Sequence, residues 1–144
     1  MNKHNYPSSQ QAWYGVVILT LAYILSFLDR QLLSLVVTDV KSDLDLTDSQ
    51  VSIILGFAFA LFYTTMGIPI GRLADKKSRR TIIGIGITFW CFMTAATGIV
   101  KTYAQLFIAR IGVGVGEATL SPSALSIISD YFPKEKSGTA MGFF

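Results

Sequence analysis

The chain has 144 residues, of which 51% are hydrophobic and only 15% are charged, with a net charge of +3. A soluble domain of this size carries about a quarter charged residues, and the mean hydropathy of +0.51 is too high for one small globular core, so a membrane protein is favoured. The single cysteine, Cys91, excludes an internal disulfide, and with a single histidine, His4, the chain offers no His/Cys metal site.

The first apolar stretch covers residues 13–37. The run from Val16 to Leu28 has the length of a signal peptide, but no small-x-small cleavage site follows it, and the charged residues Asp29 and Arg30 come next. Stopping at Leu28 would give only about 24 Å of helix against a hydrocarbon core of roughly 30 Å, whereas the full stretch gives about 37 Å. We therefore predict a retained transmembrane helix with both charges inside the membrane.

Three further apolar stretches are each long enough to cross a membrane. They cover residues 51–70, 81–100 and 103–129, and a fifth stretch begins at 138–144. Pro69 is expected to end or bend the second span, because proline lacks a backbone donor. The sequence thus predicts an all-α polytopic membrane protein with four transmembrane helices and the start of a fifth. One turn of helix left alone in lipid would have no partner, which indicates part of a longer protein.

Lysine and arginine are distributed unevenly between the connections. Eight of them lie in the tail, in the basic turn at 71–80 and in the connector at 130–136, whereas the alternate connectors hold only Lys41 and Lys101. Cationic loops are retained in the cytoplasm. We therefore predict a multi-pass protein of the plasma membrane, or bacterial inner membrane, with a cytoplasmic N-terminus. The eight residues are Lys3, Arg72, Lys76, Lys77, Arg79, Arg80, Lys134 and Lys136.

Four charged residues fall inside the predicted spans, namely Asp29, Arg30, Arg110 and Glu117. Such charges are costly and normally face a polar interior or a cavity. Helix rise places Asp29 about 12 Å and Arg110 about 9 Å below the external surface, so the two could pair. Glu117 shares a helix face with Arg110, whereas Asp29 and Arg30 lie about 100° apart and cannot point at the same spot. Structural ion pairs, a proton relay and a substrate pathway are all consistent with this pattern.

Gly112, Gly114 and Gly116 follow one another at alternate positions of the fourth span. They do not match G-x-G-x-x-G, and no strand precedes them, so we predict close helix packing rather than nucleotide binding. No Ser/His/Asp set can be assembled either. We predict no metal, no cofactor, no nucleic-acid partner and no enzymatic activity.

With these features in place, the chain resembles the major facilitator superfamily of transporters. The basic turn is similar to the superfamily's signature between its second and third spans, with Ser78 where glycine is usual. The fourth span resembles a second signature, and the four intramembrane charges are similar to the spinster-like branch. The matching residues are Gly71, Leu73, Asp75, Lys76, Arg79 and Arg80 in the first signature, and Arg110, Gly114, Gly116 and Ala118 in the second.

The resemblance implies a fold of twelve spans in two six-helix halves, with this chain covering the N-terminal part of the first half. It implies a secondary active transporter that moves a small or amphipathic solute, with an anionic one among the candidates, through a cavity that alternates between the two sides of the membrane. The implied partners are this solute, H⁺ as the coupling ion, the lipid bilayer and the remaining helices. Lipids, sugar acids and drugs stay open as solutes, and so do symport and antiport.

Residue by residue, the resemblance implies proton coupling at Asp29 and Glu117 and binding of an anionic group at Arg30 and Arg110. Gly71, Asp75, Arg79 and Arg80 would belong to a cytoplasmic gate, together with Asp130. If the backbone there is helical, the i, i+4 spacing would let Asp75 pair with Arg79. The alternative is a non-transporting membrane scaffold that associates through its small residues, or a fragment without function.

Overall fold

A computed structural model of the chain describes residues 6–144, in which every regular element is helical. Four stretches in this range are long and apolar enough to cross a membrane: Ser9–Leu35, Asp48–Lys76, Arg79–Thr97 and Tyr103–Tyr131. The predicted all-α class with four transmembrane helices is confirmed. The elements are α1 (Ser9–Leu35), α2 (Val37–Asp43), α3 (Asp48–Ser52), the π-helix η1 (Ile53–Ala58), α4 (Phe59–Lys76), α5 (Arg79–Thr97), α6 (Tyr103–Glu117), α7 (Leu120–Tyr131) and α8 (Lys134–Phe143).

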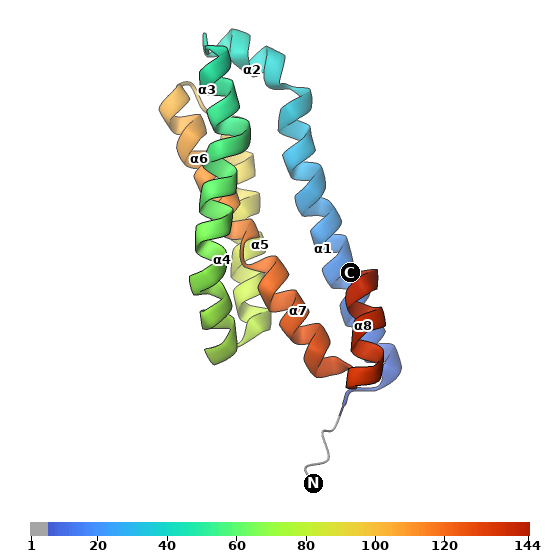
Figure 1. Ribbon diagram of the computed structural model, residues 1–144. Helices are drawn as coiled ribbons and strands as arrows, with labels where there is room; N and C mark the ends of the chain where they lie inside the picture. Colours follow the sequence, from blue (N-terminus) through green and yellow to red (C-terminus); the bar gives the residue numbers. More distant parts are fainter. Residues whose placement is uncertain (1–5) are drawn as a thin grey trace.

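The spans run up and down, so the connections alternate between the two ends of the bundle (Figure 1). The α1–α3 connection and the α5–α6 connection lie at one end, at the top of the view. The α4–α5 turn and the α7–α8 link lie at the other end, together with the start of α1. The first end carries Lys41 and Lys101, and the second carries the basic turn and the basic link. Lys3 and His4 lie outside the described residues.

The fourth span is the most buried of the four and forms the centre of the bundle. It consists of α6 and α7, which contact α4 and α5 along their length, while α1 packs mainly on α7 and α8. The helix is interrupted at Ala118 and Thr119. Pro122 explains the interruption, because its nitrogen carries no hydrogen to donate to the carbonyl of Ala118. The break leaves Glu117 as the last residue of α6.

Glycines allow α5 and α6 to approach each other closely. A Cβ added at Gly116 would lie 2.8 Å from the Cβ of Trp90 and 3.0 Å from the carbonyl oxygen of Gly86, and one added at Gly112 would lie 2.6 Å from the Cγ of Met93. Backbones can come this close only where side chains are absent. The same reasoning applies to the approach of α4 to α6. A Cβ added at Gly114 would lie 3.0 Å from the backbone oxygen of Phe59, the first residue of α4.

The second span differs from the sequence prediction in two ways. It begins with a π-helix, η1, which no residue pattern indicated. It also continues through Pro69 to Lys76, so residues 71–76 are helical and only Lys77 and Ser78 form the turn. Proline removes a single backbone donor, and the contacts of α4 with α6 and α7 hold the remaining helix in place. The prediction of a turn over the whole of 71–80 is therefore wrong.

The apolar interior has two parts. The larger lies where α1, α5, α6, α7 and α8 meet, and the smaller lies at the end that carries α2 and α3. A bundle with these two cores leaves many large apolar side chains exposed, such as Ile85, Phe92 and Ile108, as is expected where lipid or further helices cover the surface. The buried members of the larger core are Ala12, Val16, Leu19, Ile83, Trp90, Val113, Leu120, Ala124, Ile127, Ile128, Phe132 and Ala140. Those of the smaller are Leu33, Leu46, Ile54 and Leu106.

Candidate functional site

Glu117 is the centre of a polar network inside the bundle. Its side chain has no exposed surface, and its Oε2 accepts a hydrogen bond of 2.6 Å from the hydroxyl of Ser26 on α1. One turn further along α1, the Nη1 of Arg30 lies 3.6 Å from the same oxygen. Ser26 and Arg30 are spaced i, i+4 and therefore share one helix face. The arrangement joins α1 to the end of α6 by an ion pair and a hydrogen bond.

Arg30 also has an aromatic neighbour. Its guanidinium carbon lies 5.4 Å from the centroid of the Phe59 ring, within the range of a cation–π interaction. Phe59 reaches this position because Gly114 has no side chain to keep α4 away from α6. The Phe59 ring in turn stacks on Tyr63, whose hydroxyl lies 3.2 Å from the hydroxyl of Ser121. Arg30 therefore sits between a carboxylate and an aromatic face and retains 28% exposure of its side chain.

Asp29 and Arg110 line one cavity of about 350 Å³. The cavity is formed by α1, α2, α5 and α6, and most of its wall is aliphatic, with side chains such as Leu32, Val36 and Leu106. Asp29 does not form the expected ion pair with Arg110; within residues 6–144 the two are not joined by a contact of 4.0 Å or less. The Oδ2 of Asp29 instead accepts a hydrogen bond of 3.0 Å from the hydroxyl of Thr94 on α5.

Arg110 is buried, with 5% of its surface exposed. Its Nε has no hydrogen-bond partner among the described residues, and the same is true of the second oxygen of Glu117. Both Asp29 and Glu117 lie close enough for their charges to act on Arg110. The network thus contains two carboxylates and two guanidinium groups, with Arg30 paired to Glu117 and Arg110 under the influence of both acids. Such a set can exchange ion pairs without leaving a charge isolated.

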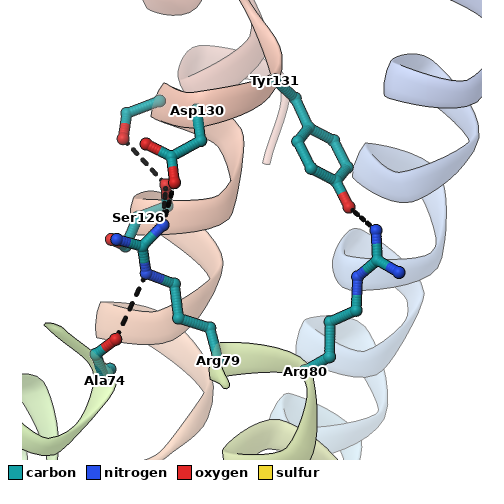
Figure 2. Close-up of polar contacts among 7 residues, drawn as sticks. Ala74, Arg79, Arg80, Ser126, Asp130 and Tyr131 are labelled. Carbon is teal, nitrogen blue, oxygen red and sulfur yellow. Dashed lines mark hydrogen bonds and ion pairs between the residues drawn. The ribbon is translucent and has the colours of Figure 1, made fainter. Parts of the chain in front are cut away.

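Arg79 joins three helices at the opposite end of the bundle (Figure 2). It begins α5, its Nε donates to the carbonyl oxygen of Ala74 over 3.3 Å, and its Nη1 donates to that of Ser126 over 3.4 Å. The same nitrogen forms an ion pair with Asp130. Ala74 lies in the last turn of α4, where carbonyl oxygens have no helical donor. A single side chain therefore completes the end of α4 and ties it to α7.

Arg80 makes a second contact between α5 and α7. It donates a hydrogen bond to the hydroxyl of Tyr131, and its guanidinium carbon lies 5.9 Å from the centroid of that ring (Figure 2). The Tyr131 ring also lies against α1, with its Cε2 3.2 Å from the position of a Cβ at Gly15. Tyr131 thus links α5, α7 and α1.

Asp75 and Gly71 are placed away from these contacts. Asp75 is exposed, and it does not pair with Arg79 because the backbone is extended at Lys77, which ends the helical spacing. Gly71 faces α7, where an added Cβ would make an ordinary contact of 3.9 Å with Pro122. Among the residues expected in a gate, the structure brings together Arg79, Asp130 and, beside them, Arg80.

Replacing Arg79 with lysine is expected to lower the free energy of unfolding by about 1–2 kcal/mol, because a lysine ammonium cannot reach three acceptors that diverge as these do. Thermal unfolding in detergent micelles measures this. Arg72→Lys is the matched control, because Arg72 is exposed on α4 and makes no hydrogen bond or ion pair seen in residues 6–144. Equal losses in the two variants would contradict the bridging role of Arg79.

Four residues of the network escaped the sequence reasoning: Ser26, Phe59, Thr94 and Tyr131. Ser26 offered a signal, since it lies one turn from Arg30 on an otherwise apolar helix. The others offered none, because a threonine or an aromatic residue in a span is ordinary. Within residues 6–144 no group of three or more His, Cys, Asp or Glu side chains could hold a metal ion.

Comparison with known proteins identifies the family. The family model of the Major Facilitator Superfamily matches residues 19–144. The chain is 33% identical over 130 residues to the probable L-galactonate transporter of Escherichia coli strain K12, a match that covers 90% of this chain and 28% of that protein. It is 35% identical over 131 residues to protein spinster homolog 1 of Xenopus tropicalis, covering 90% of this chain and 25% of that protein.

A solved structure has the same fold. The crystal structure of a bacterial homolog of the human lysosomal transporter spinster, inward-facing and unoccupied, superposes with a TM-score of 0.90 at 37% identity, covering 95% of this chain and 29% of that one. The chain therefore spans less than a third of the length of these relatives. Since the family model matches nearly all of its residues, the chain belongs to the major facilitator superfamily, with spinster proteins among its relatives.

Proposed function

We propose that this chain supplies part of the first half of a secondary active transporter that moves a small or amphipathic solute by alternating access, with protons as the coupling ion. The observation that carries the proposal is the network of two carboxylates and two guanidinium groups between α1, α5 and α6, in which Arg110 and Glu117 are buried and Asp29 and Arg30 are partly buried. Charges inside a membrane are costly and mark substrate or proton pathways. The relatives compared above are themselves transporters.

Protonation of Glu117 is the proposed coupling event. Glu117 is wholly buried and is held by Arg30 and Ser26. A proton on this carboxyl group removes its charge, and Arg30 then loses its ionic partner and becomes available to an anion. Asp29, which lines the cavity, is proposed as the second proton site. Its protonation would remove a negative charge that acts on Arg110, although the two side chains form no ion pair.

Arg30 and Arg110 are proposed to bind an acidic group on the solute. Guanidinium groups match the planar geometry of a carboxylate. Arg110 lines the cavity and is buried, and Arg30 directly follows Asp29, which lines the same cavity, on α1. The similarity to the probable L-galactonate transporter makes a sugar acid a reasonable first solute to test. The mainly aliphatic cavity wall keeps an amphipathic solute open as well.

The contacts of Arg79 with Asp130 are proposed to close the cytoplasmic side of the transporter, with Gly71, Asp75 and Arg80 in the same gate. This placement assumes a cytoplasmic N-terminus, which the basic character of that end supports. The plasma membrane is the proposed location. A non-transporting scaffold is the alternative, favoured by the small-residue positions Gly56 on η1 and Gly67 on α4, which face open space.

Coupling is tested with the complete transporter in proteoliposomes, with L-galactonate as the probe and an imposed pH gradient as the driving force. We expect the double variant Asp29→Asn/Glu117→Gln to lose accumulation of L-galactonate driven by the pH gradient. Exchange of L-galactonate between equal internal and external concentrations should remain. Asp39→Asn is the control, because Asp39 is exposed on α2 and does not line this cavity. If the double variant accumulates the probe with an unchanged pH dependence, the coupling assignment is wrong.

A further inference from the structure

Thr94 differs from the other threonines that lie within the spans. The hydroxyl groups of Thr20, Thr65, Thr88 and Thr97 each donate to the carbonyl oxygen four residues earlier in their own helix. This is the usual partner of a threonine in a transmembrane helix. The hydroxyl of Thr94 instead donates across the bundle to the carboxylate of Asp29 on α1, over 3.0 Å.

A hydroxyl group has one hydrogen to donate. By giving it to Asp29, Thr94 leaves the nearby carbonyl of its own helix without this bond, and the carboxylate gains a fixed direction. Both side chains line the cavity, and Thr97, one turn along α5, lines it too without reaching Asp29. The difference between Thr94 and Thr97 is therefore the bond to the carboxylate, because the helix and the cavity are shared.

We propose that Thr94 is a positioning residue that holds the Asp29 carboxylate toward α5 rather than in an ion pair with Arg110, in the orientation that its coupling role requires. The inference rests on the proton-coupling role proposed for Asp29. The hydrogen bond accounts for the absence of the expected Asp29–Arg110 pair, because it turns the Oδ2 of Asp29 toward Thr94 on α5.

The helices that form the cavity around Asp29 contribute four other charged groups. Arg110 and Glu117 come from α6, Asp43 comes from α2, and Arg30 follows on the same helix. Thr94 is the neutral donor in this set. The hydrogen bond from Thr94 fixes the direction of the carboxylate among these charges, so removing the donor leaves the carboxylate free to turn.

The experiment compares Thr94→Val, Thr94→Ser and Thr97→Val in the complete transporter. We expect Thr94→Val to change the pH profile of L-galactonate uptake, because the Asp29 carboxylate is then no longer held toward α5. Thr94→Ser keeps the hydroxyl and is expected to restore the profile. Thr97→Val removes a hydroxyl that bonds only to its own helix, and its profile should match the unmodified protein. Thr94→Ala replaces the valine variant if the latter does not fold.

Infrared spectroscopy gives a second readout that does not depend on transport. The Asp29 carboxylate band, identified by its loss in Asp29→Asn, is expected to shift in Thr94→Val and to stay in place in Thr94→Ser and Thr97→Val. An unshifted band and an unchanged pH profile in Thr94→Val would overturn the positioning role. If the band shifts but Asp29→Asn leaves the pH dependence of uptake unchanged, the proton-coupling role fails instead, so the two failures are distinguishable.

Discussion

Replacing Gly86 with alanine is expected to lower the free energy of unfolding by about 2–3 kcal/mol, the upper range for inserting a methyl group into a packed interior. A Cβ at this position would lie 1.8 Å from the Oγ1 of Thr119 and 2.7 Å from its Cβ. Thr119 cannot move aside freely. It is buried at the break between α6 and α7, and its hydroxyl donates to the carbonyl oxygen of Gly116 over 2.8 Å.

Gly84→Ala is the matched control for this substitution. Gly84 lies on the same helix, and an added Cβ meets nothing within 4 Å. Alanine has a higher helix propensity than glycine, so the free energy of unfolding of this variant is expected to equal that of the unmodified protein or to exceed it by up to about 1 kcal/mol. Unfolding by denaturant in mixed micelles, followed by circular dichroism, compares the two. A loss of similar size in both variants would show that helix propensity or lipid contact, rather than the α5–α7 approach, determines the effect.

Gly112→Ala should cost less than Gly86→Ala, although an added Cβ at Gly112 would also lie under 3.0 Å from its neighbours. Those neighbours are the Cγ and Sδ of Met93, near the end of an unbranched side chain that can rotate away. The obstacle at Gly86 is attached to the Cβ of a residue at a helix break and has no such freedom. The ranking of the glycines therefore follows from what each one faces rather than from their common spacing.

The fold class could be predicted from the sequence because it depends on local quantities. A span needs about 20 apolar residues, and this requirement can be read directly from composition and length. The alternation of basic and acidic connectors reinforces the count. Close helix packing at Gly112 and Gly116 could be predicted for the same reason, since these residues have no side chain whatever the fold is, but the helix that packs there could not.

The partners of the charges could not be predicted in the same way. Depth along a helix suggested that Asp29 would meet Arg110, but depth does not fix rotation about the helix axis. A threonine on a third helix, Thr94, takes the carboxylate instead. Arg79 was expected to pair with Asp75 if the helix continued. The extended backbone at Lys77 removes the helical spacing, and Arg79 forms its ion pair with Asp130 instead. Each outcome depends on a residue distant in sequence.

The π-helix η1 is a further feature that local patterns did not indicate. Its six residues carry neither a proline nor a charge. An added residue per turn rotates the helix that follows relative to the helix that precedes, and η1 is followed at once by Phe59, the aromatic partner of Arg30. The position of Phe59 in the network thus depends on an irregularity that packs against α6.

Breaking the Arg30–Glu117 pair from either side is expected to destabilise the bundle by about 2 kcal/mol. Removing one partner of a fully buried pair costs about 3–5 kcal/mol because the other charge stays buried and unpaired. The loss expected here is smaller, about 2 kcal/mol, because the Arg30 side chain is 28% exposed and water screens its charge in part. Arg30→Met leaves the carboxylate with Ser26 as its donor, and Glu117→Gln leaves the guanidinium group on the Phe59 ring.

The double variant Arg30→Met/Glu117→Gln should recover part of this loss, because neither charge remains to be compensated. A double-mutant cycle in micelles is expected to give a coupling energy of about 1–2 kcal/mol. The exposed pair Lys41–Asp48 provides the control cycle, because Asp48 is 92% exposed and its ion pair lies at the surface. No coupling should be resolved there. A coupling at Arg30–Glu117 as small as that of the surface pair would mean that Glu117 is held by Ser26 rather than by Arg30, and a proton on Glu117 would then release no anion-binding group.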